Sequence, residues 1–361
     1  MKKKQVLSWA LYDWANSAFA TTVMAGFFPV FFKQYWNAGV DPTVSTARLG
    51  VANSVASIVI VLLAPILGAI ADRSTARKKF LLIFASLGIF MTVALSLVAR
   101  GNWLLSSVLF MVAVIGFSGG NVFYDSLLTS VSEEKDFDRI SALGYSLGYL
   151  GGGILFAFNV WMTVNPEIFG FPDSTAAVRF AFITVGIWWA VFSVPLLLYV
   201  KEPPSEGGSP RNGVVRAALR QLMNTFKSIR RLKTICLFLA AYWLYIDGVD
   251  TIFRMAVDYG ISIGLNHRDL IKALLITQFV GFPSAIAFGY LGGKLGTKRC
   301  ILMAIAMYIV VSIWGAFMHS QKEFYLMAIT IGLVQGGIQA LSRSFFARII
   351  PASKSAEYFG F

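Results

Sequence analysis

Long apolar stretches alternate with short polar segments along almost the whole chain. Ten of these stretches approach or exceed the roughly 20 residues that a helix needs to cross a bilayer. They cover residues 6–32, 49–71, 80–99, 103–128, 140–162, 176–200, 234–257, 270–291, 300–318 and 323–342. Apolar and polar residues do not alternate within them, as they would in membrane-spanning strands. The pattern therefore predicts an all-α polytopic membrane protein.

Composition and charge agree with membrane insertion. Hydrophobic residues make up 57% of the chain and charged residues only 14%, whereas a soluble domain carries about 25% charge. Most of the 31 basic residues fall in segments that share one side of the membrane when the N-terminus is cytoplasmic. This asymmetry follows the positive-inside rule and explains the net charge of +13 without a nucleic-acid partner. We expect a multi-pass protein of the inner cell membrane, with the first apolar stretch kept as a span rather than cleaved as a signal peptide.

A short segment occurs twice, at residues 68–79 and 289–299. Each copy joins two apolar stretches and contains a glycine, a tight turn and a basic cluster, so the chain contains a duplicated unit. Both copies resemble the loop between the second and third helices of each half in the major facilitator superfamily. The first copy has one extra residue and lacks the inner glycine, and the second has Gly293 where the aspartate would stand.

Four other segments resemble one branch of that superfamily, the vacuole-effluxer-like transporters: residues 9–22, 144–153, 244–249 and 336–348. The resemblance implies the twelve-helix fold, built as two pseudo-symmetric bundles of six helices. It also implies export of small polar solutes, since fungal members look like exporters of amino acids from the vacuole. We expect a six-helix bundle at 1–200, a cytoplasmic linker with an amphipathic, lipid-contacting helix at 201–233, and an incomplete bundle of about four spans at 234–361.

The end of the chain departs from the family pattern. Members of the family have two further spans after Pro351, whereas this sequence stops where the eleventh helix would start. The sequence is then either a fragment or a naturally shortened member. We expect Asp72, which in the superfamily lies near the start of that helix, to lack this partner. We also expect lower stability and poorer transport than in a full-length relative.

Acidic residues inside the apolar stretches are few, and a charge there should face protein or water because it costs at least ~2.5 kcal/mol in lipid. In the superfamily, spans 1, 4, 7 and 10 line the central cavity, and the acidic residues fall on the first three of these. Spacings of three, four, seven or eight residues place polar side chains on one face of each helix. The predicted solute or proton pathway consists of Asp13, Asn16, Ser17, Asn121, Asp247, Asp250, Arg254, Gln335, Gln339 and Arg343.

Several of these charges also have structural interpretations. Asp125, near the cytoplasmic end of span 4, is expected to pair with Arg73 or Arg77. If it points into the cavity instead, it becomes a candidate substrate or proton site. Asp250 and Arg254 could form a simple pair one helical turn apart. Asp13 has no cation on its own helix, which favours a role in transport and makes it the first candidate for proton coupling, ahead of Asp247. The predicted gating or structural cluster contains Asp72, Arg73, Arg77, Asp125 and Lys294.

Other features change this picture little. Gly144, Gly148 and Gly152 form a small-residue ridge on span 5, which close helix packing explains. Two cysteines and two histidines form no metal or redox pattern, so we expect no metal and no cofactor. We predict a monomeric carrier of a small polar solute, coupled to protons if an acid titrates. The alternatives are a non-transporting scaffold or sensor, a carrier of sugars, drug-like molecules or nucleosides, and, with no motif to support it, a membrane enzyme.

Overall fold

The structure is a computed structural model that describes residues 2–202, 222–223, 225 and 232–361. We refer to residues 2–202 as the N-terminal half and to residues 232–361 as the C-terminal half. Within these residues, ten helices are long and apolar enough to cross a membrane. Each coincides with one of the ten apolar stretches, so the predicted fold class is confirmed. The expected amphipathic helix lies largely outside the described residues, and the division at 201–233 stays a prediction.

The first span is one continuous rod assembled from four helical segments. It comprises α1 (Lys2–Ala18), the π-helical η1 (Phe19–Phe27), α2 (Phe28–Phe31) and the π-helical η2 (Phe32–Trp36). The wide turns flank Pro29, which has no N–H to donate and whose ring would clash with the carbonyl of Ala25 in a regular α-helix. A π-helical insertion accommodates the proline without ending the helix.

The other spans are regular helices, several of them longer than the apolar stretch that predicted them. In the N-terminal half these are α3 (Pro42–Ser74), α4 (Arg77–Leu95), α5 (Trp103–Ser126), α7 (Phe137–Val164) and α8 (Ser174–Tyr199). In the C-terminal half they are α10 (Lys233–Ser262), α11 (His267–Leu295), α12 (Thr297–Ala316) and α13 (Gln321–Ile349). Short helices fill connections in the N-terminal half: α6 (Leu128–Val131), η3 (Glu134–Asp136) and η4 (Pro166–Phe169). Two more follow α13: η5 (Ala352–Lys354) and α14 (Ser355–Phe359).

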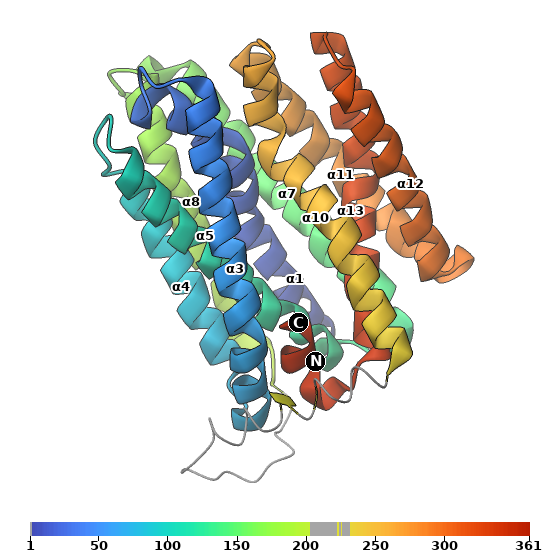
Figure 1. The fold of residues 1–361 in the computed structure, drawn as a ribbon. Coiled ribbons are helices and arrows are strands. Elements are labelled where there is room, and N and C mark those ends of the chain that lie inside the picture. The colour runs from blue at the N-terminus through green and yellow to red at the C-terminus, as the bar shows by residue number, and fades with distance from the viewer. Residues whose placement is uncertain (1, 203–221, 224, 226–231) are drawn as a thin grey trace.

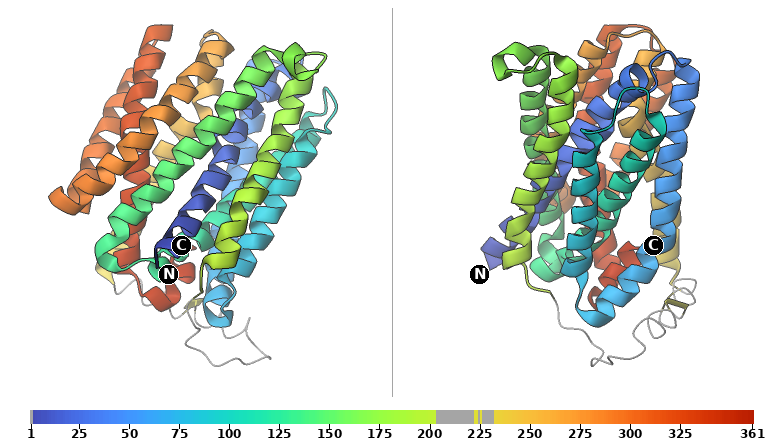
Figure 2. Two further views of the ribbon diagram at one scale, coloured as in Figure 1. Left: turned by 180° about the vertical axis from the view of Figure 1, so that it is seen from behind. Right: turned by 90° about the vertical axis from the view of Figure 1, so that its left-hand side faces the viewer.

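The spans stand side by side as a bundle of nearly parallel rods, and both chain termini lie at the same end of it (Figures 1 and 2). We call this the terminal end and the other the far end. Helix α7 joins the two halves, because it packs against α1 on one side and against α11 and α13 on the other. The short α14 packs against α3, which provides a second contact between the halves at the terminal end.

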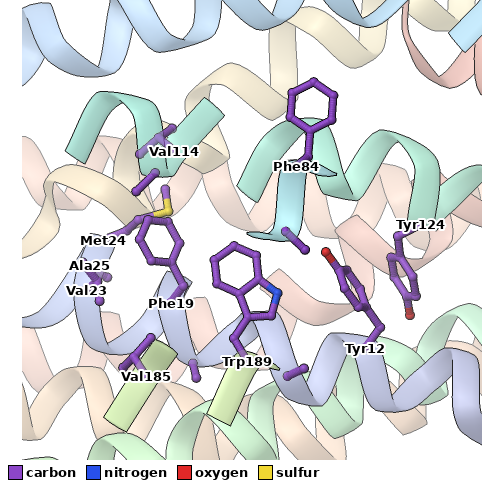
Figure 3. Packing of buried hydrophobic residues seen from close by; sticks show 14 of the residues in the cluster. Tyr12, Phe19, Val23, Met24, Ala25, Phe84, Val114, Tyr124, Val185 and Trp189 are labelled. Atoms are coloured by element: carbon purple, nitrogen blue, oxygen red, sulfur yellow. The ribbon is translucent and has the colours of Figure 1, made fainter. Parts of the chain in front are cut away.

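Aromatic side chains fill the centre of the N-terminal half. Figure 3 shows Tyr12 and Phe19 of the first span around Trp189 of α8, with Phe84 and Tyr124 close by. Outward faces of the helices are apolar as well: Leu62 and Phe90 are 64% and 68% exposed. Large apolar side chains on both inner and outer faces are expected for helices whose surroundings are lipid.

The glycine ridge of α7 lies directly against the first span. A methyl group added at Gly148 would come within 2.5 Å of the Ser17 hydroxyl, and one added at Gly151 within 2.5 Å of the Trp14 ring. These glycines therefore let the two helices approach closely, which confirms the packing interpretation.

Candidate functional site

A buried cluster of charges joins the two halves. Arg343, on α13, lies 3.3 Å from a carboxylate oxygen of Asp13 on α1 and 2.8 Å from one of Asp125 on α5. The Arg343 and Asp13 side chains are only 3% and 9% exposed, and that of Asp125 is 22% exposed. Three of the predicted site residues, from the spans expected to line the pathway, therefore meet in one site.

Further groups of the N-terminal half complete this site. Tyr124 donates a hydrogen bond of 2.7 Å from its hydroxyl to Asp13. Ser141 accepts two hydrogen bonds of 2.8 Å from the guanidinium, one at its hydroxyl and one at its carbonyl oxygen. The rings of Trp9, Tyr124 and Tyr145 lie 4.8, 5.3 and 4.3 Å from the guanidinium carbon. None of these four residues was predicted from the sequence, although Tyr124 directly precedes Asp125.

The expected pairing of Asp125 with the basic residues of the first repeated loop is wrong. The carboxylate of Asp125 binds Arg343 instead, and Arg77 pairs with Asp72 at 2.7 Å. The reason is geometric: Asp125 lies on the inner face of α5, where it faces α13 across the boundary between the halves. This places Asp125 with the pathway residues rather than with the loop.

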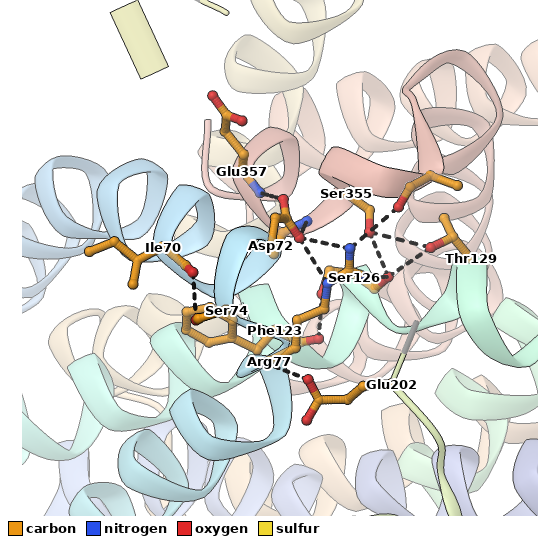
Figure 4. A network of polar contacts seen from close by, with 12 residues as sticks. Ile70, Asp72, Ser74, Arg77, Phe123, Ser126, Thr129, Glu202, Ser355 and Glu357 are labelled. Carbon is orange, nitrogen blue, oxygen red and sulfur yellow. Dashed lines mark hydrogen bonds and ion pairs between the residues drawn. The ribbon is translucent and has the colours of Figure 1, made fainter. Parts of the chain in front are cut away.

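The repeated loop forms a separate network with the last helix (Figure 4). The Asp72 carboxylate accepts a hydrogen bond of 2.8 Å from Nε of Arg77 and bonds of 3.2 and 2.8 Å from the backbone N–H groups of Ala356 and Glu357. These N–H groups lie in the first turn of α14, and a carboxylate is favoured there by the helix dipole. The expectation that Asp72 lacks this partner is therefore wrong, because the first turn of the helix is formed.

The remaining members of the predicted charge cluster contribute differently. Arg73, next to Asp72, is half-buried. Lys294 is exposed and lies over the ring of Tyr290, 4.6 Å from its centre. The second copy of the loop thus contains no counterpart of Asp72 at Gly293, and Lys294 does not join the network of the first copy.

A second polar network at the terminal end is centred on a carboxylate of α7 that binds residues of the C-terminal half. Asp138, in the first turn of α7, is buried and accepts hydrogen bonds of 3.1 and 2.8 Å from Arg348 and one of 3.0 Å from Thr297. The Ser344 hydroxyl also donates to it. Thr297 belongs to the second repeated loop, so this loop is fixed by an aspartate from across the boundary rather than by one of its own. The predicted span began at residue 140, which left Asp138 outside.

The other predicted pathway residues form smaller groups. Asn16 donates a hydrogen bond of 2.6 Å to Asn121. Asp250 and Arg254 form the anticipated pair at 3.6 Å, and the Asp250 side chain stays 42% exposed. Gln339 accepts a bond of 3.3 Å from Tyr149 of α7. The remaining three lie apart from the Arg343 site: Ser17, which contacts the glycine ridge, Gln335, which is buried, and Asp247, which is exposed.

An ion pair that sequence reasoning missed joins the halves at the far end. Lys33 of η2 lies 2.8 Å from the carboxylate of Asp258 near the end of α10, and both side chains are nearly buried. Lys33 also donates to the Ser262 hydroxyl at 3.1 Å, and Thr46 in the first turns of α3 donates to Asp258 at 2.9 Å. Asp258 is one residue beyond the predicted end of span 7, so it was not counted among the charges inside the membrane.

Among the described residues, no group of three or more His, Cys, Asp or Glu side chains could hold a metal ion. Both cysteines, Cys236 and Cys300, are free thiols. The contacts at the Arg343 site are those of charge pairing, hydrogen bonding and cation–π attraction.

Two solved structures with the same architecture are described as transporters. A structure of the proton:xylose symporter XylE bound to 6-bromo-6-deoxy-D-glucose matches with a TM-score of 0.66 and 12% identity, over 99% of this chain and 83% of that one. The human organic anion transporter MFSD10 matches with a TM-score of 0.67 and 12% identity, over 99% and 90%. At this identity the likeness concerns the fold, which is that of the major facilitator superfamily.

Sequence comparisons identify the branch. A Bacillus subtilis protein named as an uncharacterized MFS-type transporter, YxiO, is 37% identical over 360 residues, which covers 99% of this chain and 84% of the relative. Autophagy-related protein 22-1 of Penicillium rubens is 23% identical over 489 residues, covering 99% of this chain and 81% of that protein. The family described as "Vacuole effluxer Atg22 like" matches residues 42–361. The chain therefore belongs to the Atg22-like vacuole effluxer family of the major facilitator superfamily.

Proposed function

We propose that this protein is a secondary active transporter of the cell membrane that exports or exchanges small polar solutes, amino acids among them, by alternating access. Both termini would then lie in the cytoplasm, as the distribution of basic residues predicts. In this mechanism the two halves rock about a central path, and their contacts at the two ends open in turn.

The observation that carries the proposal is the placement of buried charges between the halves. Arg343 and Arg348 of the C-terminal half bind carboxylates of the N-terminal half at the terminal end. Lys33 and Asp258 join the halves at the far end. A static interface gains little from such pairs, because well-packed apolar residues are often as stabilising or more so. Hydrogen-bonded charges that can exchange partners suit an interface that separates, which favours a carrier over a scaffold.

The proposal predicts that the terminal end must open during transport. The hydroxyl groups of Thr129 and Ser355 are 3.3 Å apart across this end. Cysteines at both positions, in a chain whose native Cys236 and Cys300 are changed to alanine, can be oxidised to a disulfide that holds α14 against the N-terminal half. We expect oxidation to stop the exchange of radiolabelled amino acids in proteoliposomes and a reductant to restore it.

The single variants Thr129→Cys and Ser355→Cys control for the substitutions and for the oxidant. Undiminished flux after complete cross-linking would contradict alternating access through this end. If the uncross-linked protein is folded and exchanges none of a panel of amino acids, sugars and nucleosides, the scaffold function is favoured instead.

A further inference from the structure

The guanidinium of Arg343 occupies a receptor that is built entirely from the other half. Every hydrogen-bond acceptor and aromatic ring that contacts it belongs to α1, α5 or α7. Among the described residues, the C-terminal half contributes Arg343 to these hydrogen bonds and cation–π contacts. The receptor is defined by six residues of the N-terminal half: Trp9, Asp13, Tyr124, Asp125, Ser141 and Tyr145.

The receptor satisfies a guanidinium group completely. Nε donates to the Ser141 hydroxyl, Nη1 donates to Asp125 and Asp13, and Nη2 donates to the Ser141 carbonyl and Asp13. These are all five N–H donors that a guanidinium has. Three aromatic rings around the guanidinium carbon add cation–π attraction, which is stronger where water is excluded.

A glycine makes room for the bound group. A methyl group added at Gly144 would lie 2.4 Å from the Asp13 carboxylate and 2.9 Å from Nη2 of Arg343. The absence of a side chain at this point lets the planar cation lie close to the backbone of α7. The shape of the receptor therefore fits a flat cationic group.

Separation of the halves would leave this receptor with two carboxylates and no cation. Within the described residues, the ion pairs of Asp13 and Asp125 are both to Arg343. Two uncompensated carboxylates at a site within the membrane are costly, so a proton or another positive group has to compensate them when α13 moves away.

We infer that this receptor is a binding site for the guanidinium or ammonium group of the transported solute, and that Arg343 fills it as an internal ligand in the present conformation. The inference rests on the proposed transport function and deepens it, because it names solutes with a cationic side chain as the favoured class. When the solute enters at the terminal end, its cationic group then replaces the guanidinium of Arg343 at the carboxylates of Asp13 and Asp125.

The direct test empties the receptor and supplies the missing cation. We expect purified Arg343→Ala protein to bind methylguanidinium saturably in calorimetric titrations, about tenfold more tightly than wild type does. Urea, which is planar but neutral, should not bind. Adding Asp13→Asn to Arg343→Ala should abolish the binding. The matched control is Arg254→Ala. Arg254 pairs with one partly exposed carboxylate, that of Asp250, so its removal should create no comparable site.

Folded Arg343→Ala protein that does not bind methylguanidinium, or whose binding survives Asp13→Asn, would overturn the inference. Counterflow in wild-type proteoliposomes decides the question even if this variant fails to fold. Arginine should exchange about tenfold faster than citrulline, which has a neutral group of the same shape. Exchange of leucine with no preference for arginine over citrulline would overturn the inference and leave the proposed function intact, whereas the absence of exchange for every solute tested would count against the proposed function itself.

Discussion

At the scale of single residues, the buried charges between the helices are tolerated because they are paired with one another. Asp13, Asp125 and Arg343 satisfy one another, and Tyr124 and Ser141 supply the remaining hydrogen bonds. A group of this kind is costly to leave half-satisfied, so the removal of one member affects the whole site.

Asp13→Asn is expected to reduce solute flux by about tenfold or more, because Arg343 loses one of its two carboxylates in a buried site. If Asp13 carries the coupled proton, the pH dependence of flux should also flatten. Tyr124 donates a hydrogen bond to Asp13, and Arg343 links Asp13 to Asp125, so the protonation of one carboxylate affects the other. Flux is measured in proteoliposomes at a series of external pH values.

The control for this change is Glu133→Gln, which removes a carboxylate that is 52% exposed and whose partners, Lys2 and Lys135, are 79% and 75% exposed. Surface pairs contribute little, so flux should stay close to that of wild type. Unchanged flux and an unchanged pH profile in Asp13→Asn would exclude the proton role of Asp13.

Gly144→Ala is expected to destabilise the protein by about 1–3 kcal/mol, because the new methyl group would displace the Asp13 carboxylate from Arg343. Gly50→Ala is the matched control: it also lies within a helix, but nothing lies within 4 Å of the added methyl group. That change should be neutral or stabilising by about 0.5–1 kcal/mol. Thermal unfolding in detergent compares the two, and equal effects would show that the close approach at Gly144 does not matter.

At the scale of helices, the start of α14 is held by a carboxylate from another part of the chain. Asp72 both pairs with Arg77 and accepts from two N–H groups of α14, and it is almost completely buried. The same side chain therefore fixes the turn between α3 and α4 and attaches the end of the described chain to it. The network at Asp138 performs the corresponding task for the second repeated loop.

Asp72→Asn should cost about 3–5 kcal/mol, because it leaves the buried Arg77 without its counter-charge. Hydrogen exchange at the backbone of α14 should increase at the same time. Asp41→Asn offers a comparison, since Asp41 caps α3 at an exposed site, where its side chain accepts a hydrogen bond from the backbone N–H of Thr43. Its effect should not exceed about 1 kcal/mol. Equal losses of stability in the two variants would argue against the buried pair as the cause.

At the scale of the whole molecule, charged contacts between the halves are present at both ends. The Lys33–Asp258 pair lies at the far end, and the Arg348–Asp138 pair lies at the terminal end. Weakening one pair should shift the population of conformations toward opening at that end, because a two-state equilibrium responds to any difference in the stability of its states.

A cysteine at Gln339, in a chain whose two native cysteines are replaced by alanine, can report this shift. Lys33→Met should increase its labelling by a membrane-impermeant maleimide applied from the side of the far end. Arg348→Met should increase labelling from the opposite side. Equal labelling from both sides in both variants would mean that these pairs do not control access to the centre.

The sequence predicted the membrane spans well and the pairing of their charges poorly. Asp13 and Asp125 were identified because a charge within an apolar stretch is conspicuous. Arg343, one residue beyond its stretch, was identified because it continues the helical spacing of Gln335 and Gln339. Asp125 was paired with the wrong partner, since nothing in the sequence states which face of α5 is turned toward α13. Asp138 and Asp258 were missed because the helices extend a few residues beyond the apolar stretches, so that charges at their ends still lie between packed helices.

The sequence by itself determined the fold class, the number of spans and the duplicated loop, because these depend on apolar length and on local patterns of glycine and charge. Only the tertiary structure decided that Arg343 lies in a receptor formed by the other half, that Asp72 holds α14, and that Lys33 meets Asp258. Each of these contacts joins residues far apart in the chain. Their pairing depends on how the helices are rotated and packed, which side-chain contacts across the whole bundle determine.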